Sequence, residues 1–320
     1  MRDPHVIAVD LGGTKLATGL VDRDGGLAGR TVEPTDLADE NAVLAQLERA
    51  VGKLAENGFA ALGVGVPCTI DQRTGRAVAS VNIPLAEVDL RARLEQLFGV
   101  PVMVENDANA AALAEHRRGA GRGSRHMVML TLGTGVGGGL ILDGSLYRGA
   151  VGAAAELGHI TIDVDGPMCQ GTCPGRGHLE ALVSGTAADG LAARAAAERP
   201  DGDLGRAVRS GREADARLVT ELAVRAPGDA RDVLDHVGFH LGIGIADFVN
   251  VLNPEIVVVG GGFGEAGELI LEPARRVVRE RALAPARDEV EIVEAELGPE
   301  AGLIGSGLAA FEALDARAAA

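Results

Sequence analysis

Short apolar runs separated by glycine-rich turns open the chain and recur along it. Each run has the length of a buried strand, and Asp24-Gly25-Gly26, between the second and third runs, is a hairpin signal. The pattern predicts strands over residues 6–10, 16–21, 27–32, 61–66, 101–105, 255–262 and 290–297.

Apolar residues at helical spacing fill much of the remaining chain. Val43, Leu44, Leu47, Val51 and Leu54 fall on one helix face, since they recur every three or four residues. The spacing predicts helices over residues 43–54, 90–98, 108–118, 186–222 (with polar breaks), 232–250 and 301–319. This alternation of strands and helices is typical of an α/β fold.

The chain contains a weak internal repeat. Aligning Asp10 with Thr131 places DLGGT over TLGTG, and Leu20-Val21-Asp22 then falls over Ile141-Leu142-Asp143 without a gap. Duplication of a βββαβα unit would give two lobes, 1–119 (completed by a C-terminal helix over about 300–320) and 120–299, with both turns at an interlobe cleft. The alternative is coincidence, because short glycine runs match easily.

Composition excludes several classes of protein. The net charge of −16 argues against a broad surface for nucleic acid or anionic membrane, because phosphates would be repelled. No run approaches 18 apolar residues, so no membrane span or signal peptide is expected. Three cysteines cannot all pair, and two of them lie four residues apart among histidines, which favours metal binding over a disulfide. These observations predict a soluble cytoplasmic protein.

Three glycine runs follow apolar strands and indicate phosphate binding. Backbone N–H groups in such turns can cradle phosphate oxygens, and a carboxylate at a strand end can hold Mg²⁺ through water. An ordinary hairpin explains any one of these turns, but three together favour a nucleotide site. The candidate residues are Asp10, Gly12, Gly13, Thr14, Lys15, Gly133, Thr134, Gly135, Gly137, Gly261 and Gly262.

The run ENDANAAALAE, residues 105–115, places Asn106 and Asp107 where a strand meets a helix. A carboxylate at this point can accept a proton from a substrate hydroxyl during phosphoryl transfer. The competing interpretation is that Asn106 or Asp107 only caps the alanine-rich helix.

The segment 156–180 gathers metal-ligand residue types among glycines and prolines. His159, Cys169, Cys173 and His178 supply two nitrogens and two sulfurs, a set that fits tetrahedral Zn²⁺. A closed four-ligand site would be structural. The alternative is a pair of free cysteines with two surface histidines.

Taken together, ENDANAAAL, TLGTGVGGG and the ELGH-to-HLE segment resemble the ROK family of bacterial sugar kinases and repressors, and its zinc-containing, glucokinase-like members in particular. The resemblance runs along essentially the whole chain. It implies a two-lobed, actin-like (ribonuclease-H-like) fold with an interlobe active site. It also implies ATP, Mg²⁺ and structural Zn²⁺ as cofactors and, by analogy, a homo-oligomer (dimer or tetramer).

The resemblance also implies residue roles. Asp107 would be the base that deprotonates the 6-hydroxyl of a hexose, glucose in the leading interpretation, for attack on the γ-phosphate of ATP. The sugar hydroxyls would be bound by Asn82, Asn106, Asp107, Glu156, His159 and Glu180. His159 would ligate zinc through one ring nitrogen and contact the sugar through the other.

The chain departs from the family pattern at three points. His178 replaces a third cysteine of the zinc segment, Cys68 replaces a glycine, and Ile83 follows Asn82 in place of a nearby tryptophan. These changes leave open another sugar, such as N-acetylmannosamine, mannose or fructose. Polyphosphate as the donor and a sugar-responsive regulator without kinase activity are further alternatives. The acidic charge disfavours a DNA-binding repressor.

Overall fold

The structure is a computed structural model that describes residues 5–55, 58–80 and 83–319. The chain divides into two compact units by its internal contacts. Unit 1 comprises Met1–Arg125, Gly139–Ala155 and Pro299–Ala320, and unit 2 comprises His126–Gly138 and Glu156–Gly298. The segment Gly139–Ala155 therefore belongs to unit 1, whereas the sequence-based boundary assigned it to the second lobe.

Unit 1 is built on a five-stranded mixed sheet in the order β3-β2-β1-β4-β7. β1 pairs antiparallel with β2 and parallel with β4, which in turn pairs parallel with β7. The apolar runs predicted from the sequence form these strands. Their bounds are Val6–Leu11 (β1), Lys15–Val21 (β2), Leu27–Pro34 (β3), Leu62–Val66 (β4) and Val102–Asn106 (β7).

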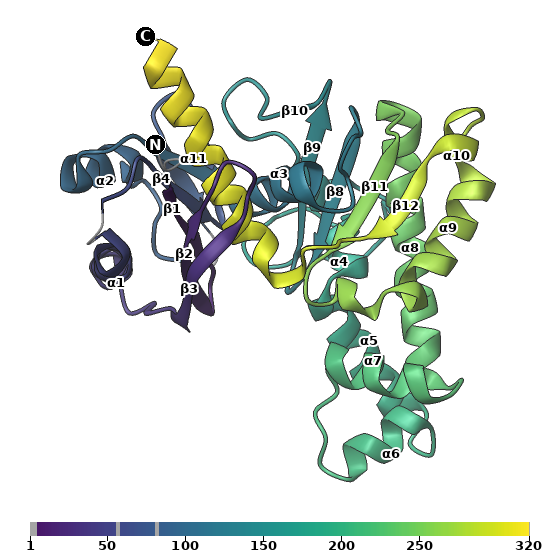
Figure 1. The fold of residues 1–320 in the computed structure, drawn as a ribbon. Helices are drawn as coiled ribbons and strands as arrows, with labels where there is room; N and C mark the ends of the chain where they lie inside the picture. Colours follow the sequence, from purple (N-terminus) through teal and green to yellow (C-terminus); the bar gives the residue numbers. More distant parts are fainter. Residues whose placement is uncertain (1–4, 56–57, 81–82, 320) are drawn as a thin grey trace. The chain divides into compact units, whose positions relative to one another are not determined.

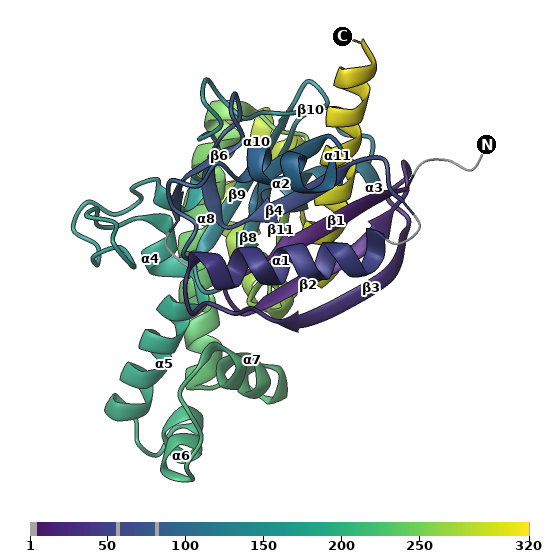
Figure 2. The same ribbon diagram turned by 90° about the vertical axis from the view of Figure 1, so that its left-hand side faces the viewer.

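Helices cover both faces of this sheet (Figures 1 and 2). Ile7 and Val9 pack in the cluster that contains α1 (Glu40–Leu54) and α2 (Leu90–Phe98). Their neighbours on the strand point the other way, as side chains along a strand must, and Val6 packs with α11 (Ala301–Ala319). α3 (Asp107–Arg118) lies against α11 on that second face. The helices predicted over 43–54, 90–98, 108–118 and 301–319 are thus confirmed.

One hairpin of unit 1 was not predicted. β5 (Cys68–Asp71) and β6 (Arg76–Ser80) pair antiparallel as a two-stranded sheet. Both strands are short and mix charged with apolar residues, so they lack the apolar run that marks the other strands. The hairpin matters for the site because β5 follows β4 almost directly and contacts β7.

The second sheet repeats the strand order of the first. Its order is β10-β9-β8-β11-β12, with β8 parallel to β11 and β11 parallel to β12. Position by position this matches β3-β2-β1-β4-β7, which supports duplication over a chance match of two turns. The bounds are Met127–Leu132 (β8), Val136–Leu142 (β9), Ser145–Leu146 (β10), Ile256–Gly260 (β11) and Glu291–Glu294 (β12).

Unit 2 adds a helical region to this plan. The long helix α8 contacts α4, α5, α7 and α9, so it forms the centre of the helical packing. The bounds are Leu179–Val183 (α4), Gly185–Glu198 (α5), Asp203–Arg209 (α6), Ala216–Arg225 (α7), Asp229–Leu252 (α8), Glu268–Arg281 (α9) and Ala286–Glu289 (α10). Within the described residues, no helix combines the length and apolar character needed to cross a membrane.

Candidate active site

The first glycine-rich turn joins β1 to β2. Asp10 stands next to the end of β1, and the Gly12 N–H donates to the Lys15 carbonyl at 2.9 Å, which closes the turn. Thr35, which directly follows β3, donates its hydroxyl to the Gly12 carbonyl at 2.7 Å and so stabilises the turn. Thr14 and Lys15 are exposed, so this turn presents both side chains to solvent.

The carboxyl group of Asp10 lies beside the first turn of α11, where a Cβ atom on Gly302 would stand 3.0 Å from Asp10 Cγ. Burial raises the pKa of Asp10, repulsion from Asp107 raises it further and Lys15 opposes both, with a resulting pKa of about 6. A nearby cation would relieve the repulsion between the two carboxylates. Carboxylate oxygen is also the ligand type that Mg²⁺ prefers, so this corner of unit 1 fits the metal.

Asp107 is the first residue of α3, and Asn106 is its N-cap. The Asn106 side-chain oxygen accepts hydrogen bonds from the N–H groups of Ala108 (3.0 Å) and Asn109 (3.1 Å). The capping interpretation is therefore confirmed for Asn106, whereas a role for Asp107 as a base stays a prediction. Burial raises the pKa of Asp107 above its ordinary value, against hydrogen bonds from backbone N–H groups that lower it. A raised pKa brings a carboxylate closer to the strength of a useful base.

Cys68 and Asn82 are two further positions that the sequence singled out. Cys68 is buried, and burial raises the pKa of its thiol to about 11, with Ser80 lowering it and Asp107 raising it. The Cys68 carbonyl accepts a long hydrogen bond, 3.5 Å, from Asn106 Nδ2. Asn82, predicted to bind sugar, lies outside the described residues.

The second and third glycine runs come together in unit 2. The Gly133 N–H donates to the Gly135 carbonyl at 2.9 Å, and the Gly133 carbonyl accepts from Gly185 N–H, at the start of α5, at 2.8 Å. The run after β11 joins them, since Phe263 N–H donates to the Leu132 carbonyl at 2.9 Å. The turn after β8, the turn after β11 and the α5 N-terminus thus meet, an arrangement suited to phosphate groups.

Glu180, in the first turn of α4, is held against the second glycine turn. Its Oε2 accepts a hydrogen bond from the Val136 N–H at 2.8 Å. A Cβ atom at position 135 would overlap that carboxylate, so Gly135 is required for this approach. Glu180 Oε1 also lies 3.6 Å from Cys169 Sγ, which connects the glycine turn to the cysteine segment.

His159, Cys169, Cys173 and His178 form one cluster, with their ligand atoms all within 4.8 Å of one another. His159 Nδ1 and His178 Nδ1 are 3.3 Å apart, and each lies 3.6 Å from one cysteine sulfur (Cys169 and Cys173, respectively). Ligands of a tetrahedral zinc ion, at about 2.0–2.1 Å for nitrogen and about 2.3 Å for sulfur, are separated by about 3.3–3.8 Å. The residues therefore fit a tetrahedral metal of this type.

Backbone hydrogen bonds fold the segment so that these ligands meet. Cys169 N–H donates to the Gly175 carbonyl at 2.9 Å, and Ile162 and Asp163 both donate to the Gly177 carbonyl. Gly177 has φ of +61°, and a Cβ atom there would overlap the Asp163 carbonyl, so only glycine fits. His159 ends a short 3-10 helix, Leu157–His159, with Glu156 immediately before it. Because His159 turns Nδ1 toward the cluster, Nε2 is the nitrogen left for a second partner.

The sequence profile of the ROK family matches residues 6–312. The chain belongs to the ROK family. A glucokinase from Halalkalibacterium halodurans is 34% identical to this ROK protein over 315 residues, which cover 96% of this chain and 95% of that one.

Solved structures agree with this assignment. A ROK glucokinase from Streptomyces griseus, in complex with glucose and AMPPNP, superimposes with a TM-score of 0.83 at 33% identity, covering 96% of this chain and 99% of that one. The ROK hexokinase from Thermus thermophilus superimposes with a TM-score of 0.78 at 34% identity, covering 98% of this chain and 99% of that one. The ROK chain therefore has the predicted α/β fold of the actin-like ATPase type, with two sheets of the same strand order.

Sequence reasoning missed two charged residues near Asp107 of this ROK protein. Glu105, immediately before Asn106, is 1% exposed and pairs with Arg148, which follows β10. Glu105 gave a signal, because a charge at the end of an apolar strand must find a partner when buried. Arg148 gave none, since it is an isolated arginine in a glycine-rich segment.

Proposed function

We infer that this ROK protein is an ATP-dependent glucokinase, which transfers the γ-phosphoryl group of ATP to the 6-hydroxyl of glucose. Similarity to glucokinases over almost the whole chain carries the inference, together with an AMPPNP- and glucose-bound relative of the same fold. The placement of Asp107 at the start of α3, near Asp10 and the first glycine turn, supports it independently.

In the reaction we propose, Asp107 is the general base. Its carboxylate accepts the proton of the sugar 6-hydroxyl, the oxygen forms a bond to the γ-phosphorus, and the bond to the β-phosphate oxygen breaks to release ADP. The raised pKa of Asp107 suits this role, because a carboxylate with an ordinary pKa is a weak base at neutral pH.

We propose the remaining roles from the resemblance to the family. Asn82, Asn106, Glu156, Glu180 and the Nε2 atom of His159 would accept or donate hydrogen bonds to sugar hydroxyls. The turns at Gly12–Lys15, Gly133–Gly137 and Gly261–Gly262 would bind the nucleotide phosphates. Charged acceptors make hydrogen bonds that are strong and selective for hydroxyl orientation.

We also propose the ions. Asp10 would hold Mg²⁺, which when bound neutralises phosphate charge. The His159 cluster would hold a structural Zn²⁺ that fixes the ring of His159 and, through Cys169, the neighbourhood of Glu180. The free cysteines and the use of ATP fit a cytoplasmic enzyme, and the family analogy extends to a homo-oligomer, a dimer or tetramer.

One observation favours a second candidate, a ROK kinase for another hexose. The buried Cys68 brings a side chain close to Asp107, since the charge of Asp107 acts on its thiol. A side chain at that point narrows the space beside the base, where the sugar would lie. Mannose, fructose or N-acetylmannosamine would be the substrates to compare.

An ADP-release assay over glucose, mannose, fructose, N-acetylglucosamine and N-acetylmannosamine tests the proposal. Glucose is expected to give a kcat/KM at least about 10-fold above the others, because hydroxyl-specific hydrogen bonds reject wrong isomers strongly. A higher kcat/KM for another sugar would favour the second candidate. Glucose binding without turnover of any sugar would indicate a regulator and contradict the kinase assignment.

Asp107→Asn tests the base. The variant is expected to bind glucose but to lose about 10²-fold or more in kcat, as general-base removal does. Near-normal turnover would remove Asp107 from that role.

A further inference from the structure

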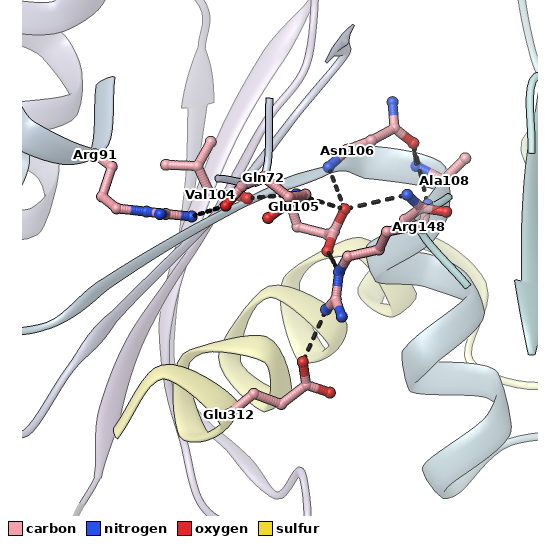
Figure 3. Close-up of polar contacts among 9 residues, drawn as sticks. Gln72, Arg91, Val104, Glu105, Asn106, Ala108, Arg148 and Glu312 are labelled. Atoms are coloured by element: carbon pink, nitrogen blue, oxygen red, sulfur yellow. Dashed lines mark hydrogen bonds and ion pairs between the residues drawn. The ribbon is translucent and has the colours of Figure 1, made fainter. Parts of the chain in front are cut away.

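A buried carboxylate stands two residues before the proposed base. Glu105, at 1% exposure, ends the buried part of β7, and four donors surround it (Figure 3). They are Asn106 N–H at 3.0 Å, Asn109 Nδ2 at 3.1 Å and Gln72 Nε2 at 3.3 Å, all to Oε1, and Arg148 Nε at 2.6 Å to Oε2.

Arg148 continues the network toward the C-terminal helix. Its Nη2 donates to Glu312 Oε2 of α11 at 2.8 Å, and its side chain is 22% exposed, against 40% for Glu312. Burial lowers the pKa of Arg148, but Glu105 and Glu312 together outweigh it and raise the pKa above its ordinary value. The guanidinium is thus held charged between two carboxylates. Of its two ion pairs, the one with Glu105 is the more buried.

The contacts of Glu105 bracket position 107. Asn106 N–H lies on one side of Asp107 in the chain and Asn109 on the other, and Glu105 Oε1 accepts from both. The side chain of Asn106 fixes the same turn by capping α3. With the backbone anchored before and after it, Asp107 has little freedom to shift, and displacement of a reacting group by about 1 Å costs up to about 10²-fold in rate.

The pair also connects two other segments of unit 1. Gln72, in the turn after β5, donates Nε2 to Glu105 and its N–H to the Val151 carbonyl at 3.3 Å. Val151 and Arg148 belong to the same segment after β10, and the bond from Arg148 to Glu105 holds this segment at the end of β7. Hydrogen bonds therefore connect each of three segments to the other two: the turn after β5, the segment after β10 and the β7–α3 junction.

We propose that Glu105 and Arg148 are positioning residues for phosphoryl transfer, which orient Asp107 through the β7–α3 junction without contacting substrate. This inference rests on the function proposed above, in which Asp107 is the base. Neutralising Arg148 removes the ionic partner of the buried Glu105 carboxylate, and neutralising Glu105 leaves Arg148 with only the more exposed Glu312 as a partner. In either case the junction must rearrange, because a buried charge has lost its closest counter-charge.

Steady-state kinetics and calorimetric glucose binding on four variants, compared with a control, test the inference. Glu105→Gln and Arg148→Met are each expected to lower kcat by about 10- to 100-fold while the Kd for glucose stays within about 3-fold. Arg148→Lys keeps the positive charge but lacks the planar guanidinium group, so its kcat should lie between those of Arg148→Met and the wild type. The double variant Glu105→Gln/Arg148→Met should lose no more kcat than the more impaired of the two single variants, because both substitutions break the same ion pair.

Asp315→Asn is the matched control. It breaks an exposed ion pair with Arg23 on the same helix as Glu312, and kcat should be unchanged. Wild-type kcat in Glu105→Gln and Arg148→Met would overturn the inference. So would equal losses in kcat and glucose affinity, which indicate a general structural role.

Asp107→Asn, measured alongside, separates the two proposals. If Asp107→Asn is inactive and the Glu105 and Arg148 variants turn over normally, the positioning role is wrong and the base stands. If Asp107→Asn itself turns over normally, the proposed base is wrong and the positioning role falls with it. Because Glu105→Gln and Arg148→Lys nearly conserve volume, thermal unfolding of these two checks that each remains folded.

Discussion

Asp107 raises the pKa of Asp10. The two carboxyl groups belong to different elements, Asp10 to β1 and Asp107 to the start of α3, and their repulsion adds to burial in bringing the pKa of Asp10 to about 6. Unit 1 thus holds two acidic groups that oppose each other until a cation or a proton intervenes.

The first prediction concerns this coupling directly. Asp107→Asn removes one negative charge, so the pKa of Asp10 should fall below about 6 while burial keeps it above the ordinary 3.8. Carbon-13 NMR of labelled aspartate carboxyl groups, in the absence of nucleotide and Mg²⁺, measures the titration. An unchanged Asp10 pKa would mean that the two groups do not interact.

The second prediction concerns stability and pH. A raised folded-state pKa means that the favourable contribution of Asp10 is present below about pH 4 and is lost as pH rises through about 6. At about pH 8 the buried charge then costs up to about 3 kcal/mol, from a shift of roughly two pKa units.

Asp10→Asn should therefore raise the free energy of unfolding at about pH 8 by about 1–3 kcal/mol, while kinase activity falls. The gain should shrink as pH is lowered from 6 toward 4, where wild-type Asp10 is protonated in the folded state. Urea unfolding of the nucleotide-free protein at several pH values measures it. A variant less stable than wild type at pH 8 would contradict the assignment.

The third prediction concerns the metal. Protein purified without added zinc should contain about one zinc per chain, and a chelator should lower both the melting temperature and the activity. Cys169→Ser should lose the metal. Cys68→Ser is the matched control, because Cys68 lies outside the cluster of four ligands, and it should retain the metal. Equal zinc content in the two variants would contradict the site.

The fourth prediction concerns the glycine turn that Glu180 contacts. Gly135→Ala should destabilise the protein by about 0.5–1.5 kcal/mol, since the Glu180 carboxylate must move away from the added methyl group and lose its hydrogen bond from Val136 N–H. Gly133→Ala, two residues earlier, meets no atom within 4 Å and should change stability by less than about 0.5 kcal/mol. Thermal unfolding without ligand compares them, and equal effects would show that the Glu180–Val136 contact does not constrain the turn.

Local pattern explains what could be predicted of the fold. Most strands and helices followed from apolar spacing, because most of them bury a continuous face. β3 is the exception, since none of its residues is fully buried, and the hairpin signal at Asp24-Gly25-Gly26 helped to place it. α9 was missed, since Pro273 lies inside it and charged residues surround its apolar positions. The β5–β6 hairpin was missed because neither strand has an apolar run.

The sequence by itself determined the cluster of four candidate metal ligands and the strand-turn elements, because their residues are close along the chain. His159 and His178 are 19 residues apart, and short-range backbone hydrogen bonds bring them together. Only the tertiary structure decided the pairing of Glu105 with Arg148 and of Arg148 with Glu312, separated by 43 and 164 residues. The same holds for the pKa of Asp10. Burial and charge depend on which distant segments pack together, and no local pattern encodes that.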